Sequence, residues 1–470
     1  MSIALWWIRR DLRLADNQAL TSAIEMSARV LPVFVIDPQL LASPYVGENR
    51  LAFLYAGLRA LEEDLRQRGS TLVVRSGDPL QVLSGLFAEV SAEAIFAEED
   101  YSPYARTRDQ MVSENLPLQL TPGLTVHHPG SVVKSDGSPY TVFTPFSKAW
   151  MAQPWPGTPL PAPQEIPTPA NVNSEGIPTE SGSTNGILFA PGEKEAHRRL
   201  AAFSESVIYQ YEEDRNRMDL PATSTLSPYL RFGMLSARQA AAAARKTQDQ
   251  AENEVFKRGA ETWLNELIWR EFYIAILYHF PFVRQTDFRP TFRKLPWINN
   301  KDDFAAWTLA RTGYPLVDAA MRQLVKTGWM HNRARMISAS FLVKDLLVDW
   351  RWGERWFMQH LIDGDPAANN GGWQWSAGTG TDAAPYFRIF NPVLQGRKYD
   401  PDGNYVRRWL PELADIPTRF IHSPWEMPVE MQRQLGCVIG QDYPAPVIDH
   451  AFARQRALDI YRKAAQNMNN

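Results

Sequence analysis

The sequence predicts an α/β domain with a doubly wound parallel sheet, followed by a long linker and an all-helical domain. Short apolar runs alternate with amphipathic stretches over residues 1–130, as expected for strands separated by crossover helices. Nine prolines fall between Pro154 and Pro191, and such a segment cannot build a packed core of its own. Helical periodicity dominates the rest of the chain. We therefore place the α/β domain at 1–130, the connector at 131–195 and the helical domain at 196–470.

Four apolar runs in the first domain have the length and composition that a buried parallel strand requires. They lie at residues 3–8, 30–36, 72–74 and 94–97. Helical stretches separate them at residues 16–28, 48–68 and 79–90. We expect Asp16 to cap the first of these helices and Gly69 to end the second. No G-x-G-x-x-G motif follows the first strand, so dinucleotide binding at the usual position is not supported.

The C-terminal part carries apolar residues at i, i+3 and i+4 spacing in several segments, which is the pattern of amphipathic helices. These segments lie at residues 261–278, 315–326, 333–348 and 354–361. An alanine run at 240–244 adds a strong helix former. We therefore predict that this part is helical almost throughout.

The composition, with 44% hydrophobic and 21% charged residues, is that of an ordinary globular protein. A net charge of -3 excludes a uniformly basic nucleic-acid-binding surface but is compatible with a local basic groove. The single cysteine, Cys437, cannot form an intramolecular disulfide. No window approaches the roughly 18 apolar residues of a membrane span. We expect a cytoplasmic monomer and, because the eight histidines lack metal-ligand spacing, no metal site.

The segment at residues 361–376, LIDGDPAANNGGWQWS, is the most informative single stretch. Two aspartates flank a glycine, two asparagines and two glycines follow, and two tryptophans close the segment. Carboxylates and amides suit the edges of a planar ligand, and aromatic rings suit its faces. A polar turn followed by core aromatics accounts for the same residues equally well. Tryptophans concentrate nearby, because eight of the 16 lie between Trp297 and Trp375.

Two helical strings place chemically useful side chains on one helix face. In WLNELIWREFY, Glu266, Trp269 and Arg270 stand at i, i+3 and i+4, which suits a planar, hydrogen-bonding ligand. An exposed face with a local Glu–Arg pair is the alternative. In GWMHNRARM, Asn332 and Met336 are four residues apart and share a face.

A third string, TSTLSPYLRFG, offers hydroxyls and backbone N–H groups just before a helix. Such a turn suits a pyrophosphate, although it would also serve as a simple N-cap. Basic side chains in the same half either follow a phosphate backbone or form a solvated face. They are Arg322, Lys326, Arg333, Lys344, Arg397, Lys398, Arg407 and Arg408.

Taken together, these strings resemble the class I photolyases that repair cyclobutane pyrimidine dimers, within the photolyase/cryptochrome family. The resemblance is carried by WWIRRDLRLADN, TSTLSPYLRFG, WLNELIWREFY, TGYPLVDAAMRQL, GWMHNRARM, DGDPAANNGGWQW, FNPVLQGRKYD and YPAPVIDH. It covers essentially the whole chain apart from the proline-rich connector. It implies an FAD-binding helical domain and a light-driven lyase acting on UV-damaged DNA, single- or double-stranded. In the implied reaction, excited and fully reduced anionic FAD donates an electron to a flipped-out dimer, the cyclobutane ring splits, and the electron returns.

The resemblance also assigns residues to the flavin. The implied positions around FAD are Tyr211, Thr223, Ser224, Thr225, Leu226, Ser227, Trp263, Arg270, Arg335, Asp363, Gly364, Asp365 and Asn369. Asn369 matches the position facing flavin N5, where repair photolyases carry Asn and plant and animal cryptochromes usually carry Asp or Cys. Trp373, Trp350 and Trp307 match the tryptophan chain that re-reduces the flavin in light.

A second group of positions matches the family's contacts to DNA and the dimer. These positions are Arg215, Glu266, Trp269, Arg270, Asn332, Arg333, Met336, Trp375 and Gln395. A dimer stacks and pairs poorly, so flipping it out of the duplex costs less than flipping normal bases. Trp269 and Trp375 would form apolar walls for it, and Glu266 would stabilise the charge that develops on the pyrimidine.

Three alternatives remain open from the sequence. Relatives that repair (6-4) photoproducts typically carry histidines at the positions of Asn332 and Met336, which this chain lacks. A cryptochrome-type flavin photoreceptor without repair activity is disfavoured by Asn369. A helical nucleic-acid-binding protein without flavin leaves the hydroxyl turn and the aspartate segment unexplained.

The first domain resembles the antenna-binding domain of the family. The string EEDYSPYARTRD is more similar to members that bind 8-hydroxy-5-deazaflavin than to those that bind methenyltetrahydrofolate. FMN, a folate and an empty site all remain open. The resemblance indicates Val35, Ile36, Asp37, Arg50 and Asp100 as contacts to this second chromophore.

Overall fold

The computed structural model describes residues 2–179 and 189–466. The chain divides into two compact units, each built from several segments. Unit 1 comprises Met1–Glu212, Thr223–Pro281 and Ile362–Ala367, and unit 2 comprises Glu213–Ala222, Phe282–Leu361 and Ala368–Asn470. Residues 180–188 of the expected connector lie outside the described residues. The domain boundaries expected from the sequence stay a prediction.

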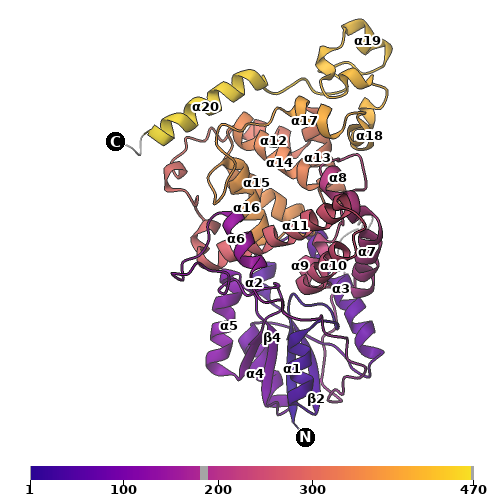
Figure 1. Cartoon of the computed structure of the whole chain (residues 1–470), viewed down its shortest axis with the longest axis vertical. Helices are drawn as coiled ribbons and strands as arrows, with labels where there is room; N and C mark the ends of the chain where they lie inside the picture. The colour runs from indigo at the N-terminus through magenta and orange to yellow at the C-terminus, as the bar shows by residue number, and fades with distance from the viewer. Residues whose placement is uncertain (1, 180–188, 467–470) are drawn as a thin grey trace. The chain divides into compact units, whose positions relative to one another are not determined.

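Unit 1 contains a parallel sheet of five strands in the order β3-β2-β1-β4-β5 (Figure 1). The strands are β1 (Ile3–Ile8), β2 (Arg29–Ile36), β3 (Val73–Ser76), β4 (Ala94–Glu98) and β5 (Leu118–Thr121). The chain winds outward from β1 in both directions, which is the doubly wound arrangement. The predicted α/β class is confirmed. Strand β5 was not predicted, because it is a largely exposed edge strand with sequence LQLT and lacks the apolar run of a buried strand.

Helices cover both faces of this sheet. Odd-numbered strand residues such as Leu5 and Val33 pack with Leu83, Leu86 and Val112 of α4 (Pro79–Glu89) and α5 (Pro103–Asn115). Helix α1 (Gln18–Met26) contacts β1, β2 and β4. Because parallel crossovers are right-handed, reversing the winding direction places α1 on the opposite face from α4 and α5.

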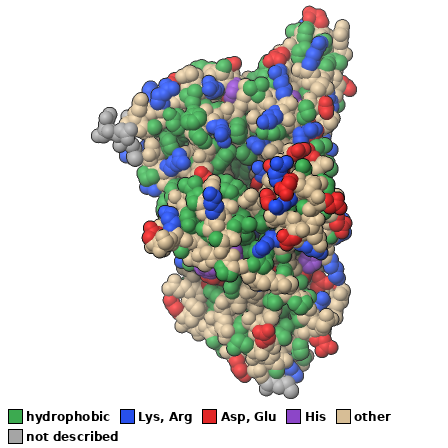
Figure 2. Space-filling model, viewed as in Figure 1, with side chains coloured by type: hydrophobic (Ala, Val, Ile, Leu, Met, Phe, Trp, Pro, Cys, Tyr) green, Lys and Arg blue, Asp and Glu red, His purple; other side chains and the backbone are tan. Residues whose placement is uncertain are grey.

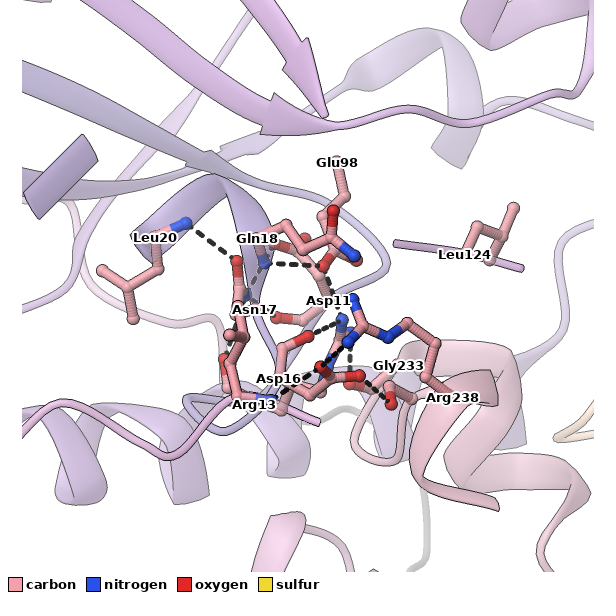
Figure 3. A network of polar contacts seen from close by, with 12 residues as sticks. Asp11, Arg13, Asp16, Asn17, Gln18, Leu20, Glu98, Leu124, Gly233 and Arg238 are labelled. Carbon is pink, nitrogen blue, oxygen red and sulfur yellow. Dashed lines mark hydrogen bonds and ion pairs between the residues drawn. The ribbon is translucent and has the colours of Figure 1, made fainter. Parts of the chain in front are cut away.

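The loop after β1 is held by a network of buried polar side chains, which Figure 3 shows. Arg13 donates a hydrogen bond to Glu98 at the end of β4, 2.5 Å away. Ser236, at the start of α10 (Ala237–Asp249), donates to the carboxylate of Asp16 at 2.5 Å. The middle and the end of the loop are thereby tied to other elements of unit 1.

Two helix ends differ from the prediction. Asn17 caps α1, because its side chain accepts from a first-turn N–H, whereas the expected cap Asp16 has a φ of 53 and is bonded to Ser236. Helix α3 (Glu48–Arg66) is capped by Gln67. Gly69 lies beyond this cap, where its φ of +74 lets the chain turn away from the helix.

The rest of unit 1 is helical or irregular. Its remaining helices are α2 (Pro38–Leu41), α6 (Phe143–Met151), α7 (Glu193–Glu205), η1 (Val207–Gln210), α9 (Ser227–Phe232), α10 and α11 (Glu254–His279), and α8 (Tyr211–Asp214) reaches the boundary of the unit. The described residues between α6 and α7 contain no helix or strand. This agrees with the proline content of that segment.

Unit 2 is helical, as predicted for the C-terminal part. Its α-helices are α12 (Lys301–Thr308), α13 (Pro315–Thr327), α14 (Asn332–Ser340), α15 (Trp350–His360), α16 (Pro366–Ala377), α17 (Pro392–Tyr399), α18 (Asn404–Trp409), α19 (Val429–Gln434) and α20 (His450–Gln466). The first two residues of α16 belong to unit 1. Short helical turns join them: η2 (Pro281–Arg284), η3 (Pro290–Phe292), η4 (Phe341–Asp345), η5 (Pro411–Leu413), η6 (Thr418–Phe420) and η7 (Pro424–Glu426). The main core of this unit buries three tryptophans, Trp307, Trp350 and Trp373. Tyr461 of α20 packs in a separate cluster with Phe292 and Leu295. In the described part of the chain, no helix is long and apolar enough to span a membrane.

Two predictions about this half are wrong in detail. The polar turn considered for residues 361–376 is helical from Pro366 onward as α16, in which Asn370 and Gln374 both donate to the carbonyl of Val283 at 3.0 Å. These bonds to a neighbouring segment stabilise a helix that the Gly and Asn content disfavours. The helix expected at 333–348 ends as α14 at Ser340 and continues into the π-helical turn η4.

Candidate functional site

Helix α11 presents the expected face of Glu266, Trp269 and Arg270. All three side chains are half-buried, and their spacing within a continuous helix places them together. Arg270 donates to the carbonyl of Leu124 at 3.0 Å, which fixes the guanidinium at one end of this face. The face thus combines a carboxylate, an indole and an anchored cation.

Trp269 is held by an aromatic partner from another segment. The ring of Phe143 stacks on it with centroids 3.7 Å apart and planes 5° from parallel. Tyr273 and Phe272, one turn along α11, contact it with centroids 5.6 Å away. This packing presets the orientation of the indole, which lowers the entropy cost of stacking a flat ligand on it.

The aspartate segment of unit 1 is fixed by two arginines. Arg10 Nη2 donates to Asp365 Oδ2 at 2.6 Å, and Arg231 Nε donates to the carbonyl of Gly364 at 2.7 Å. Asp365 also accepts from the N–H of Ala367 at 2.9 Å. Although burial opposes ionisation, the guanidinium of Arg10 and two further arginines hold the pKa of Asp365 below its usual range. The carboxylate is therefore ionised and oriented.

This arginine cluster fits an anionic ligand. Burial, together with the positive charges of Arg10 and Arg50 nearby, lowers the pKa of Arg231 to about 9. Its Nη1 is buried without a hydrogen-bond partner among the described residues. A phosphate or another anion would satisfy this donor. The residues present therefore fit a phosphorylated cofactor such as FAD.

The hydroxyl turn at Thr223–Ser227 precedes α9, which is only six residues long. Thr225 has a φ of 52, and its hydroxyl accepts from Arg199 Nη1 at 3.0 Å. A left-handed threonine is uncommon and points to a locally constrained turn. Because α9 is so short, its dipole adds little to the binding of a phosphate. The groups of this turn that could bind a phosphate are the hydroxyls, the backbone N–H groups and Arg199.

Tyr211 and Trp263, both expected near the flavin, meet at a third aromatic side chain. Phe203 contacts the ring of Tyr211 at 5.7 Å and that of Trp263 at 4.9 Å. Both residues are buried. They contribute rigid apolar surface within unit 1.

Four of the five expected antenna residues lie at or just beyond the carboxyl ends of β2 and β4, where ligands bind in open α/β sheets, and the fifth, Arg50, lies in the first turn of α3. Val35 and Ile36 end β2, and Asp37 caps α2 while accepting a hydrogen bond from Tyr104. Burial lowers the pKa of Arg50 to about 10, opposed by the charges of two aspartates of the 363–365 segment.

Asp100 lies just beyond the end of β4, and Arg10 pairs with it at 3.5 Å. Two small hollows in unit 1 are both lined by Arg10, Asp100 and Leu124. One of them also touches Asp365. The expected antenna residue Asp100 and the expected flavin residue Asp365 thus border the same part of unit 1.

Helix α14 of unit 2 begins at a buried histidine. His331 Nδ1 accepts from the N–H of Arg333 at 3.1 Å and so caps the helix. Burial, together with two nearby arginines, lowers the pKa of His331 to about 4. Asn332 and Met336 share one face as predicted, with Nδ2 and Sδ 3.8 Å apart.

Arg333, an expected DNA contact, is fixed by two neighbours in unit 2. It donates to Asn216 Oδ1 at 2.6 Å and lies 4.6 Å over the ring of Tyr399. Arg215, expected to act with it, is half-buried in the adjoining segment. Gln395 on α17 has a buried Oε1 without a partner among the described residues. Figure 2 shows Lys and Arg side chains scattered among hydrophobic, acidic and other groups, so the face drawn is not uniformly basic.

The tryptophans expected to carry electrons lie in the core of unit 2. Trp307 and Trp373 meet edge to face at 6.0 Å, and Trp350 Nε1 donates to Asp287 Oδ1 at 2.8 Å. A Cβ at residue 353 would lie 2.1 Å from Trp373, so glycine is required where α15 meets this ring. Trp375, two residues later, is half-buried and contacts Phe390 at 6.5 Å.

Asn369 and Arg335 complete the expected flavin positions in unit 2. Asn369 Nδ2 donates to the carbonyl of Glu354 at 2.9 Å, which orients its amide. Arg335 Nε donates to the carbonyl of Met330 at 2.8 Å. Among the residues with assigned structure, no three His, Cys, Asp or Glu side chains form a group that could hold a metal ion.

Sequence reasoning missed three residues that shape the site: Phe143, Arg10 and Arg231. Phe143 lies in the segment assigned to the connector, so nothing linked it to Trp269. Arg10 lies within the first quoted motif, but its partner Asp365 is 355 residues away. The available signal was that Arg10 and Arg231 both lie within motifs that carry the resemblance, WWIRRDLRLADN and TSTLSPYLRFG.

Comparison with known proteins places these observations in a family. Residues 4–165 match the family described as DNA photolyase, and residues 263–463 match the FAD binding domain of DNA photolyase. The chain is 41% identical to a deoxyribodipyrimidine photo-lyase of Synechococcus sp., over 98% of this chain and 96% of the relative. A bacterial class III photolyase from Agrobacterium tumefaciens has a similar structure, with a TM-score of 0.93, 37% identity and coverage of 99% of this chain and 98% of that one. A Synechocystis cryptochrome is also similar, with a TM-score of 0.89, 30% identity and coverage of 98% and 99%.

Proposed function

Because the chain belongs to the photolyase/cryptochrome family, we propose that it repairs cyclobutane pyrimidine dimers in DNA in a light-dependent reaction. Its relatives named as photo-lyases support a photolyase enzyme in general. The finer claim concerns the lesion. Class I membership stays a prediction, because the similar structures include a class III photolyase.

The observation that carries this proposal is the face of α11. Trp269, held flat by Phe143, offers an apolar wall to a flipped-out dimer. Glu266 on the same face accepts or donates a hydrogen bond at the pyrimidine edge and stabilises charge there. On α14, Asn332 and Met336 offer an amide and a thioether, and neither side chain titrates near neutral pH. Because the pair on α14 offers no acidic group, it suits a lesion whose repair needs an electron rather than a proton donor.

FAD is the cofactor that this family binds. When bound and reduced, it supplies the light-driven electron. In unit 1, the hydroxyl turn and Arg270 would hold it, together with Asp363, Gly364 and Asp365. Arg335 and Asn369 are proposed as flavin contacts on the resemblance to the family alone. The tight packing around Trp263 and Tyr211 would exclude water from its rings.

Trp307, Trp350 and Trp373 would pass electrons to the flavin in light when the flavin has become oxidised. The direct contact between Trp307 and Trp373 supports this role. So does the bond from Trp350 to Asp287, because a carboxylate stabilises a positively charged indole. A second chromophore, 8-hydroxy-5-deazaflavin, would occupy the region of Val35–Asp37, Arg50 and Asp100.

The test is repair of a defined lesion. The purified chain with chemically reduced FAD would be mixed with an oligonucleotide carrying one thymine cyclobutane dimer and illuminated with blue light. We expect the ultraviolet absorbance of intact thymine to return in light but not in darkness. A parallel oligonucleotide with a (6-4) photoproduct should remain unrepaired.

The alternative is a flavin photoreceptor without repair activity, which the similarity to a cryptochrome favours. A chain that binds FAD and responds to light but leaves both lesions intact would support this alternative. A chain that binds no FAD would contradict both.

A further inference from the structure

Arg10 contacts two carboxylates that the proposed function assigns to different chromophores. Its Nη2 lies 2.6 Å from Asp365 Oδ2, in the segment proposed to hold FAD. Its Nη1 lies 3.5 Å from Asp100 Oδ1, in the region proposed for the antenna. Its Nε donates to the carbonyl of Arg231 at 3.3 Å. One guanidinium therefore bridges both regions within unit 1.

We propose that Arg10 is a positioning residue that couples the antenna region at Asp100 to the flavin segment at Asp365. This inference rests on the proposed function, because it takes Asp365 as part of the FAD site. Neither the motif that contains Arg10 nor the strings around the two aspartates indicated such a link.

The rigid geometry of the guanidinium couples its two contacts. The planar fork of arginine presents two nitrogens at fixed angles, so moving one contact moves the other. The side chains of Arg10 and Asp365 are 14% and 15% exposed, which limits the water available to replace a lost contact. A change at Asp100 therefore reorients the donor at Asp365.

The coupling reaches the flavin segment through the backbone. Asp365 Oδ1 accepts from the N–H of Ala367, in the first turn of α16. Arg231, whose own carbonyl accepts from Arg10, donates to the carbonyl of Gly364. Arg10 thus influences both ends of the Gly364–Asp365 peptide, directly at one end and through Arg231 at the other.

The first test measures FAD binding to the flavin-free full chain by quenching of flavin fluorescence. Arg10→Gln should raise the dissociation constant for FAD by at least about tenfold, because it leaves a buried carboxylate with fewer partners. Arg13→Gln is the matched control, because it removes the more deeply buried pair with Glu98 in the same loop without touching Asp100 or Asp365. Equal weakening by both variants would show general destabilisation and overturn the inference.

The second test asks whether Asp100 acts through Arg10. Asp100→Asn should weaken FAD binding about threefold or more in the parent chain, as residues in one ion-pair network usually couple. The same substitution should have no effect in the Arg10→Gln background. An equal effect in both backgrounds would overturn the inference.

A conservative variant separates charge from geometry. Arg10→Lys keeps the positive charge but cannot contact both carboxylates through a rigid fork. It should bind FAD with intermediate affinity and abolish the effect of Asp100→Asn, and it serves as the background of the second test if Arg10→Gln does not fold. Retention of that effect in the lysine background would contradict the inference.

These outcomes are distinct from failure of the proposed function. If the parent chain does not bind FAD, the proposed function and this inference fail together. If the parent binds FAD but Arg10→Gln binds it with the same affinity, only the inference fails.

Discussion

Acidification from pH 7 to pH 5 is expected to destabilise the chain through His331, which caps the helix carrying Asn332 and Met336. The neutral imidazole accepts the N–H of Arg333 through Nδ1 at 3.1 Å. Protonation would remove this acceptor and place a positive charge beside two arginines in a site only 4% exposed. The folded chain therefore resists protonation of this histidine.

The size of the effect follows from the pKa of His331, which burial and two arginines lower from 6.5 to about 4. Between these values the unfolded chain binds more protons than the folded one, so stability falls as pH falls and levels off below pH 4. The full difference corresponds to about 3 kcal/mol, of which about 2 kcal/mol is lost between pH 7 and pH 5. Burial also lowers the pKa of His422 to about 4, so the parent chain shows a second, separate contribution.

The assay is urea unfolding of the parent and of His331→Asn at several pH values. Asparagine is a favoured N-cap residue and does not titrate, so the variant keeps the cap and loses the proton site. The free energy of unfolding should fall by about 2 kcal/mol less in His331→Asn than in the parent over this pH range. His197→Asn, which removes a half-buried histidine elsewhere in the chain, is the control for loss of a histidine as such. If the free energy of unfolding of His331→Asn depends on pH as steeply as that of the parent, the role assigned to His331 is wrong.

Three further outcomes follow from the proposed site. Trp307→Phe should block light-driven re-reduction of the flavin yet leave repair intact when FAD is reduced chemically beforehand, and loss of repair in the pre-reduced variant would refute that division of roles. Glu266→Gln should lower the quantum yield of dimer repair by about tenfold or more while leaving the affinity for dimer-containing DNA nearly unchanged, and an unchanged yield would contradict its role in stabilising charge. Phe143→Ala should weaken binding of dimer-containing DNA about fivefold, since an aromatic pair contributes about 1 kcal/mol. Fluorescence anisotropy measures this change, the exposed Phe452→Ala serves as control, and equal affinities would show that Trp269 needs no support.

The sequence by itself determined the features that depend on neighbouring residues. Strand β1 was predicted with its observed bounds, and the helices α1, α3 and α4 of the first domain to within two residues at each end, because hydrophobic periodicity is local. The shared face of Glu266, Trp269 and Arg270 followed from the helical period alone. The same holds for Asn332 and Met336 on α14.

Only the tertiary structure decided which distant segments meet. The edge strand β5 and the helix α16 depend on neighbours that satisfy their backbones, so their own residues did not predict them. The stack of Phe143 on Trp269 joins residues whose sequence patterns are unrelated. The bridge from Arg10 to Asp365 joins residues 355 positions apart. A helical period is a property of adjacent residues, whereas a buried ion pair of this kind exists only after folding has brought both segments out of water.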